Sequence, residues 1–221
     1  MKVLVIAAHP DDEVIGAGGT IARHVALGDE VHLSVVTEGY TPDWPAETLE
    51  EKRKEVFRAA EVLGIRRISF CGFPTVQLNT VPYKELCEKV GECVQQSQPQ
   101  IVYTTPRGDI NRDHHIVYEA TLVATRPVPG SSVRRLLSYE GPPTTRFGAP
   151  FVENLFIPNV YIDISTTLEK KIEAMSQYRT ELKEFPHPRS LKALRLYAEE
   201  RGISVGLKAA EIFQLVREII A

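Results

Sequence analysis

The sequence predicts an α/β protein in which a mostly parallel sheet is covered by helices on both faces. Apolar runs of strand length alternate with amphipathic segments of helix length, and this alternation repeats four times. The first run, residues 3–8, contains no polar side chain, as expected of a strand that is buried on both faces. The 221 residues fit one domain, and no linker or repeat divides them. We therefore expect a single domain over residues 1–221.

The first half of the chain supplies its elements in strand–helix order. Residues 3–8 are rich in β-branched side chains and too short for a helix. Apolar and small side chains recur with helical spacing over residues 14–27, and Gly28 ends that helix. Residues 47–63 form a charged amphipathic helix that stops at Gly64. The other elements expected here are strands at 31–37, 67–71 and 101–105 and a helix at 83–96.

The second half is less regular. Residues 126–157 are rich in proline, glycine, serine and threonine, and only 136–139 has the pattern of a strand. We expect this segment to be a loop excursion or lid rather than a second core. A strand at 160–164 and helices at 167–182, 190–201 and 208–220 complete the prediction. Ser165 or Thr166 is the expected N-cap of the first of these helices.

Composition excludes several functional classes. The chain has 26 Lys and Arg against 29 Asp and Glu, a formal charge of −3, so it lacks the basic character of a nucleic-acid-binding domain. The apolar run at residues 3–8 is too short to cross a membrane or to form a signal-peptide core. Cys71, Cys87 and Cys93 cannot all pair, and no C-x-x-C spacing occurs. We expect reduced, mostly buried thiols in a cytoplasmic protein that binds neither membranes nor nucleic acids.

Two clusters of histidine and carboxylate follow predicted strands. The first is residues 9–13 (HPDDE), and the second is residues 108–115 (GDINRDHH). A helix N-cap requires only one acidic residue, so capping explains neither His9 nor the paired Asp11 and Asp12. The carboxyl ends of parallel strands meet at one rim of a sheet, where ligands bind. The two clusters are therefore expected to form one site.

The residue types in these clusters suit a catalytic zinc ion. Such an ion takes about three nitrogen or oxygen ligands from the protein and keeps one position open for water. His9, His114 and one aspartate of the pair would supply the three ligands. The other aspartate would then lie where a general base is needed.

These segments resemble the LmbE/PIG-L family of zinc-dependent N-acetylglucosaminyl deacetylases. The family signature is A-H-P-D-D-E after the first strand and a later H-x-D-H; residues 8–13 match the first, and residues 111–114 (NRDH) resemble the second. Residues 53–64, 158–164 and 201–213 also resemble family segments. The resemblance implies an LmbE-like fold, which is a Rossmann-like three-layer arrangement with a mostly parallel sheet.

The resemblance also implies roles for individual residues. Zinc would be held by His9, Asp12 and His114. Asp11 would activate water as a base and later protonate the departing amine. Asp113 would orient the site, and Arg53 matches an arginine that lies close to the substrate in relatives.

One position departs from the family pattern. Asn111 stands where many relatives have the first histidine of H-x-D-H, which helps to stabilise the tetrahedral intermediate. An amide can donate a hydrogen bond but carries no positive charge. Either Asn111 performs this milder role or another residue supplies the charge. His187, which lies between two prolines, is one candidate, and a surface loop position is its alternative.

The remaining histidines and the specificity loops complete the site prediction. Adjacent helical residues do not share a face, so His115 is expected to be structural. His24 and His32 lie inside a predicted helix and strand, which favours packing. Residues 38–45, which include Tyr40 and Trp44, and residues 126–157 are the expected determinants of specificity.

The implied activity is zinc-dependent removal of the N-acetyl group from an N-acetylglucosamine-type sugar or conjugate. The resemblance further implies a homo-oligomer, since trimers and trimer-based hexamers occur among relatives. One alternative is a Rossmann-type nucleotide-binding domain without hydrolytic activity, suggested by glycines at residues 16, 18 and 19 and by Glu38. Another is a metal-binding protein that has lost catalysis through Asn111.

Overall fold

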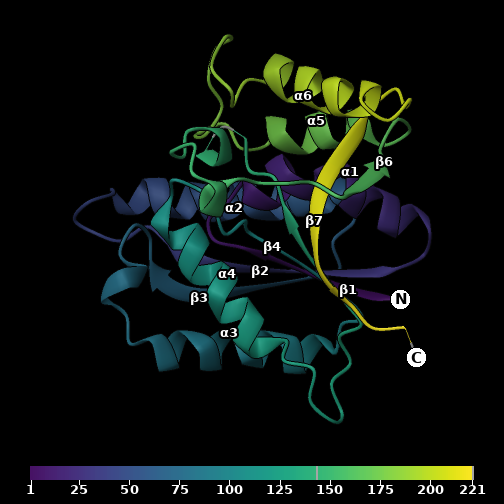
Figure 1. The fold of residues 1–221 in the computed structure, drawn as a ribbon. Coiled ribbons are helices and arrows are strands. Elements are labelled where there is room, and N and C mark those ends of the chain that lie inside the picture. The colour runs from purple at the N-terminus through teal and green to yellow at the C-terminus, as the bar shows by residue number, and fades with distance from the viewer. Residues whose placement is uncertain (143, 221) are drawn as a thin grey trace.

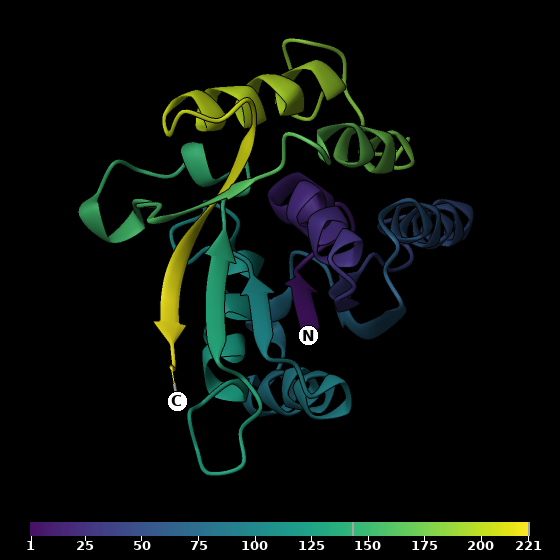
Figure 2. The ribbon, with the colours of Figure 1, turned by 90° about the vertical axis from the view of Figure 1, so that its right-hand side faces the viewer.

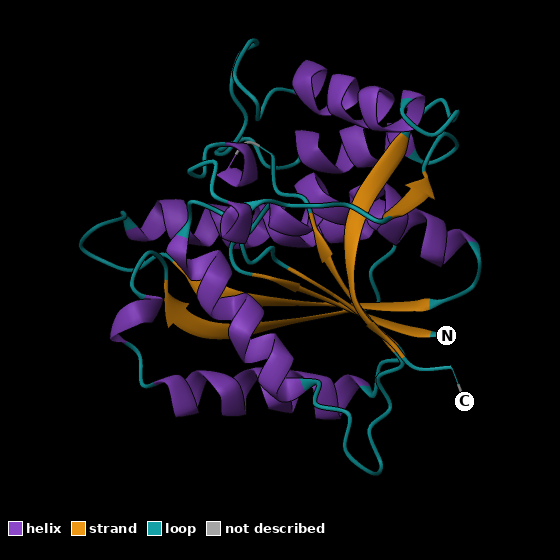
Figure 3. Ribbon diagram, viewed as in Figure 1, coloured by secondary structure: helices purple, strands orange, loops and turns teal. Residues whose placement is uncertain are grey.

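The computed structural model describes residues 1–142 and 144–220. A single seven-stranded sheet, in the order β3-β2-β1-β4-β5-β7-β6, forms the centre of the molecule (Figures 1 and 3). Its strands are β1 (Lys2–Ala7), β2 (Glu30–Glu38), β3 (Arg67–Pro74), β4 (Ile101–Thr104), β5 (Arg135–Tyr139), β6 (Val160–Asp163) and β7 (Ala210–Glu218). The helices are α1 (Asp12–Ala26), α2 (Ala46–Leu63), α3 (Tyr83–Ser97), α4 (Arg112–Ala124), α5 (Leu168–Ser176) and α6 (Leu191–Ile203).

The sheet is mostly parallel, as predicted. Strands β1 to β5 run in one direction, and β7 pairs antiparallel with both β5 and β6. Consequently β7 ends at the edge of the sheet where β1 begins, and the two ends of the described chain lie on the same side of the molecule (Figure 1). Among the described residues, no helix is both long enough and apolar enough to cross a membrane.

Helices cover both faces of the sheet and give the molecule its layers. Helices α3 and α4 pack on one face, α1 and α2 pack on the other, and α5 and α6 stack beyond α1 (Figures 1 and 2). The side chains of β1 divide between the two cores: Val3 and Val5 pack toward α1 and α2, whereas Leu4 and Ile6 pack toward α3 and α4. The first strand is therefore buried on both faces, which explains its uninterrupted apolar sequence.

Helix α1 lies unusually close to its neighbours because of its glycines. A Cβ atom on Gly16 would lie 2.3 Å from Cδ2 of Tyr139, and one on Gly19 would lie 2.8 Å from the side chain of Ile164. These glycines allow close helix packing, and they do not form the phosphate loop that the nucleotide-binding alternative requires. That alternative is not favoured.

The C-terminal helix prediction was wrong. Residues 208–220 were expected to be helical, but Ala210–Glu218 form strand β7. The apolar pattern of this segment fits either conformation, and β7 is stabilised by partner strands on both sides, β5 and β6. Such pairing depends on strands distant in sequence, which local periodicity does not record.

A further difference concerns α5. Helix α5 ends at Ser176, six residues before the predicted end, and its N-cap is Thr167, whose hydroxyl donates to the Gly19 carbonyl. The predicted cap Ser165 instead donates to the Asp163 carboxylate, which holds it in a local turn. The strand predicted at 136–139 within the 126–157 segment is confirmed as β5, which belongs to the main sheet. Pro143 of that segment, like Ala221, lies outside the described residues.

Candidate metal centre

The candidate site lies where the sheet topology changes direction. Strands β1 and β4 are neighbours, yet the chain leaves β1 toward β2 on the other side. In such sheets the loops after the two central strands separate and leave a crevice, which is the usual ligand site. His9 follows β1 by two residues, and α4, which carries His114, follows β4.

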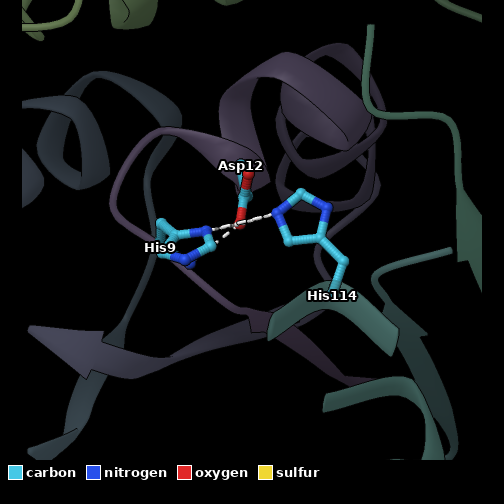
Figure 4. A group of neighbouring side chains, drawn as sticks. All are labelled: His9, Asp12 and His114. Carbon is cyan, nitrogen blue, oxygen red and sulfur yellow. Dashed lines mark hydrogen bonds and ion pairs between the residues drawn. The ribbon is translucent and has the colours of Figure 1, made fainter. Parts of the chain in front are cut away.

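His9, Asp12 and His114 direct one donor atom each toward a common point (Figure 4). Nδ1 of His9 lies 3.2 Å from Nε2 of His114, and Oδ2 of Asp12 lies 3.3 Å from each of these nitrogens. Ligand atoms of a tetrahedral zinc ion, about 2.0–2.2 Å from the metal, are roughly 3.3–3.6 Å apart. The triangle of donors therefore fits a zinc-sized ion.

A carboxylate lies next to the second ring nitrogen of each imidazole. Nε2 of His9 lies 3.0 Å from Oδ2 of Asp113, and Nδ1 of His114 lies 3.0 Å from Oδ2 of Asp109. Metal-binding histidines characteristically direct their second nitrogen to a carboxylate or carbonyl, which fixes the orientation of the ring. The His9 ring has that hydrogen bond, and the Asp109 carboxylate lies within ion-pair distance of the His114 ring.

The aspartates around His9 and His114 favour positive charge at the donor atoms. Burial lowers the pKa of His9, but hydrogen bonds to Asp113 and Asp12 outweigh it and raise the pKa to about 9. Burial also lowers the pKa of His114, but Asp12 and Asp109 outweigh this effect and raise the pKa to about 10. Burial raises the pKa of Asp12, but His114 and His9 hold it far below its usual range. Protons and a cation compete for the same donor atoms, so this anionic environment fits a divalent metal.

Asp11 occupies the turn between β1 and α1. Its backbone is in the left-handed region (φ 96°), and its carbonyl accepts from the N–H groups of Val14 and Ile15. The side chain is buried, with Oδ2 3.5 Å from Nη1 of Arg189. Burial, then the neighbouring charge of Asp12, raise the pKa of Asp11 well above its ordinary value. A strained backbone and a perturbed carboxylate together are typical of functional positions.

A cavity of about 360 Å³ opens beside these residues. His9, Asp11, Asp12 and His114 form its polar end. The remaining wall combines apolar and charged side chains from the loops after β2 and β3, from β3 and α2, and from the segment between α5 and α6. Its members include Trp44, Leu49, Lys52, Arg53, Phe70, Val76, Glu181 and Arg189. The cavity therefore gives a small molecule access to the candidate metal centre.

Residues 4–125 match the family described as "PIG-L: GlcNAc-PI de-N-acetylase", which is more than half of the chain. The chain belongs to the PIG-L family.

Proteins similar to this chain are named for different activities. The chain is 28% identical to the diacetylchitobiose deacetylase of Thermococcus kodakarensis over 196 residues, covering 84% of this chain and 70% of the relative. It is 26% identical to the 4-oxalmesaconate hydratase of Pseudomonas putida over 192 residues, covering 79% and 71%. Its fold is similar to that of the conserved protein TT1542 from Thermus thermophilus, with a TM-score of 0.79, 27% identity and coverage of 99% and 96%.

Two predicted site residues of this PIG-L family member line the cavity in constrained positions. Asn111 is the N-cap of α4, and its Oδ1 accepts from the Asp113 backbone N–H, which leaves its Nδ2 group as a donor. Arg53 lies with its guanidinium 4.1 Å from the centre of the Phe70 ring and 3.3 Å from Oε1 of Glu38.

The loop before α6 places a different residue in the cavity than expected. His187 is exposed and outside the cavity lining, and its Nδ1 accepts from the Arg189 backbone N–H at 3.0 Å. Arg189 lines the cavity, and its Nη1 lies 2.5 Å from Oε2 of Glu181. The histidine therefore helps to shape the loop, and the arginine supplies the positive charge near Asp11.

Three other histidines lie outside the donor triangle. His115 contacts the Asp109 carbonyl, His24 bonds to Asp29 and Tyr103, and His32 bonds to Glu30. Each has local polar partners that account for its position.

Sequence reasoning assigned no role to Asp109 or Arg189. Asp109 lies within the second motif, but its role depends on its position next to the His114 ring. The spacing of the motif does not reveal that position. Arg189 comes from a loop far along the chain, and no local pattern distinguishes it from other surface arginines.

Proposed function

We propose that the chain is a zinc-dependent deacetylase that removes the N-acetyl group from an N-acetylglucosamine-type sugar or conjugate. The observation that carries this proposal is the triangle of His9, Asp12 and His114 donors beside the buried Asp11, at the end of a cavity in a PIG-L family chain. The name of the Thermococcus kodakarensis relative, diacetylchitobiose deacetylase, supports the substrate class.

His9, Asp12 and His114 would hold the metal, which when bound supplies a Lewis acid that polarises the amide carbonyl and makes water more acidic. Asp11 takes a proton from the attacking water and returns it to the departing nitrogen. A carbon–oxygen bond forms and the amide carbon–nitrogen bond breaks, which yields acetate and the free amine. The raised pKa of Asp11 suits a group that both accepts and donates a proton near neutral pH.

Charge that develops on the carbonyl oxygen requires donors or cations within the cavity. Asn111 offers an amide N–H, and Arg189 offers the positive charge that an amide lacks. Glu181 holds the Arg189 guanidinium at 2.5 Å and also pairs with Lys52, so the arginine is fixed in place. We assign to Arg189 the electrostatic role for which His187 was considered.

The cavity wall suits a sugar with an apolar face. Trp44, Leu49 and Phe70 present apolar surface, while Glu38 and Arg53 present hydrogen-bonding groups. Tyr40 supports Trp44 from outside the lining, with ring centroids 5.5 Å apart in an edge arrangement. Aromatic faces stack on the C–H surface of a hexose, and the polar groups then fix its hydroxyls.

Hydration of a carbon–carbon double bond is a second candidate, because one relative is named a hydratase. A hydratase adds water without breaking a carbon–nitrogen bond and so releases no acetate. A catalytically inactive metal-binding protein would also release none. Acetate release therefore separates the proposal from both.

The decisive experiment measures acetate release from a panel of N-acetylated mono- and disaccharides, before and after chelation and with Zn²⁺ restored. We expect activity to disappear on chelation and to return with Zn²⁺. Asp11→Asn should retain near-stoichiometric metal and lose turnover, whereas His114→Ala should lose both. Activity that survives chelation would contradict the metal requirement, and a fully active Asp11→Asn variant would contradict the assigned base.

A further inference from the structure

Two cysteines on different elements lie close together away from the metal centre. Cys71 is on β3 and Cys93 is on α3, and their Sγ atoms are 3.8 Å apart. Cys71 packs with the core between the sheet and helices α3 and α4, and neither sulfur lines the catalytic cavity. The catalytic proposal uses neither residue.

The surroundings of Cys93 favour a reactive thiol. Its Sγ lies 3.8 Å from Oγ of Ser69, which bonds at 2.8 Å to Oγ of Ser34. A hydrogen bond from Cys71, helped by those from the two serines, outweighs the effect of burial and lowers the pKa of Cys93 to about 6. Thiolates are the nucleophilic form of cysteine, so the lowered pKa favours a thiolate within this pair.

The backbone at Cys71 can adjust. Strand β3 is at the edge of the sheet, and its register with β2 shifts between Phe70 and Phe73. The intervening Cys71 and Gly72 form a bulge in which Gly72 has φ 76°. Joining the sulfurs requires them to approach from 3.8 Å to about 2.05 Å. Cys71 and Gly72 are outside the register of pairs with β2, so this approach breaks no pair of the ladder.

A small oxidant can reach Cys71. A second cavity of about 360 Å³ is lined by Cys71, Gly72 and Phe73 on the strand and by side chains of α3 between residues 85 and 92. Cys71 therefore lies at the wall of a solvent-accessible cavity, whereas the Cys93 residue is buried and its Sγ is 3.8 Å from that of Cys71.

We propose that Cys71 and Cys93 form a dithiol that a peroxide converts to an intramolecular disulfide. One sulfur of the pair, as the thiolate, attacks one peroxide oxygen, which breaks the O–O bond and gives a sulfenic acid and hydroxide. The other thiol then attacks the sulfenic sulfur and expels water as the S–S bond forms. Two thiols and one hydrogen peroxide thus yield one disulfide and two waters. This site is independent of the proposed deacetylase activity.

Peptide mapping of the peroxide-treated, metal-loaded protein tests this proposal. Trypsin places Cys71, Cys87 and Cys93 on separate peptides, residues 68–84, 85–89 and 90–107. We expect hydrogen peroxide to lower the intact mass by about 2 Da, the loss of two hydrogens, and to join 68–84 to 90–107. Dithiothreitol should restore the original mass, and a non-reducing gel should show a monomeric chain.

Matched serine variants provide the controls. Cys87→Ser should form the cross-link as readily as the wild type, whereas Cys71→Ser and Cys93→Ser should form none. Free Cys71 and Cys93 after treatment, oxidation of each sulfur to sulfinic acid without a cross-link, or a cross-link through Cys87 or between chains would each overturn the proposal. Peptide mapping of the wild-type protein tests for the disulfide even if a variant folds poorly.

Discussion

Asp113 connects three segments of the site. Its Oδ2 accepts from the Val76 backbone N–H at 2.6 Å and lies 3.0 Å from Nε2 of His9, and its Oδ1 accepts from the Leu78 backbone N–H. Burial raises the pKa of Asp113, but the bonds to His9 and Val76 lower it below the ordinary value. The carboxylate is therefore ionised and holds the loops after β1 and β3 against α4.

Individual residues of the site were predictable where the motif is contiguous. His9, Asp11 and Asp12 lie within one turn, so their proximity follows from covalent geometry, and the topology rule added His114. The partners of the imidazoles were harder to predict. Which carboxylate faces which ring depends on side-chain direction across the crevice, and sequence spacing does not determine that direction.

Asp109→Asn is expected to weaken metal binding by about 10–100-fold, because the His114 ring loses the anionic partner that orients it. Titration against a competing chelator measures this affinity. Asp29→Asn is the matched control, since Asp29 pairs with His24 in the same way far from the donor triangle. Equal metal affinity in the two variants would contradict a supporting role for Asp109.

Arg189→Gln is expected to lower kcat by about 10²–10³-fold with unchanged metal content, because a cation near the developing oxyanion is lost. Arg189→Lys should recover part of the rate, since it keeps the charge but not the geometry. Arg195→Gln, which removes an exposed arginine paired with Glu169 of α5, should leave kcat unchanged. A wild-type kcat for Arg189→Gln would exclude the assigned role.

At the scale of elements, the sequence predicted the first half of the fold better than the second. Strands β1, β2 and β4 are buried, so their apolar runs are diagnostic. Strand β7 is partly exposed along its second half, and its spacing of apolar residues fits a helix as well. Pairing with β5 and β6 decides the conformation there, and that information lies elsewhere in the chain.

Gly16→Ala is expected to lower the free energy of unfolding by about 1–3 kcal/mol, because the new Cβ would lie 2.3 Å from Cδ2 of the buried Tyr139. Urea unfolding followed by circular dichroism measures this change. Gly91→Ala is the control: a Cβ on this residue of α3 would meet no described atom within 4 Å, so the better helix propensity should stabilise by about 0.5–1 kcal/mol. Stabilisation by both substitutions would show that α1 can move away from the sheet.

At the scale of the whole molecule, one buried ion pair joins three elements. Nζ of Lys171 on α5 lies 2.5 Å from Oε1 of Glu211 on β7, and both side chains are almost fully buried. The Glu211 carboxylate also accepts from the Gly19 and Thr20 backbone N–H groups of α1. No sequence pattern links these residues, because they are brought together only when β7 enters the sheet.

Lys171→Met is expected to destabilise the protein by about 3–5 kcal/mol, because Glu211 would keep a buried charge without its cation. The double variant Lys171→Met, Glu211→Gln removes that charge and should be no less stable than Lys171→Met alone. Denaturant midpoints of the two single variants and the double variant provide the comparison. Additive losses would show that the two residues act independently.

The strand order also determines when the sheet can be completed during protein synthesis. Strand β6 pairs only with β7 in the described sheet, and β7 is translated well after both β5 and β6. Until then the edge of β5 that pairs with β7 keeps its backbone N–H and C=O groups unpaired. An unpaired edge of this kind is a template for association with other unfinished chains. Slow translation between β6 and β7 would therefore increase the dependence of this protein on chaperones.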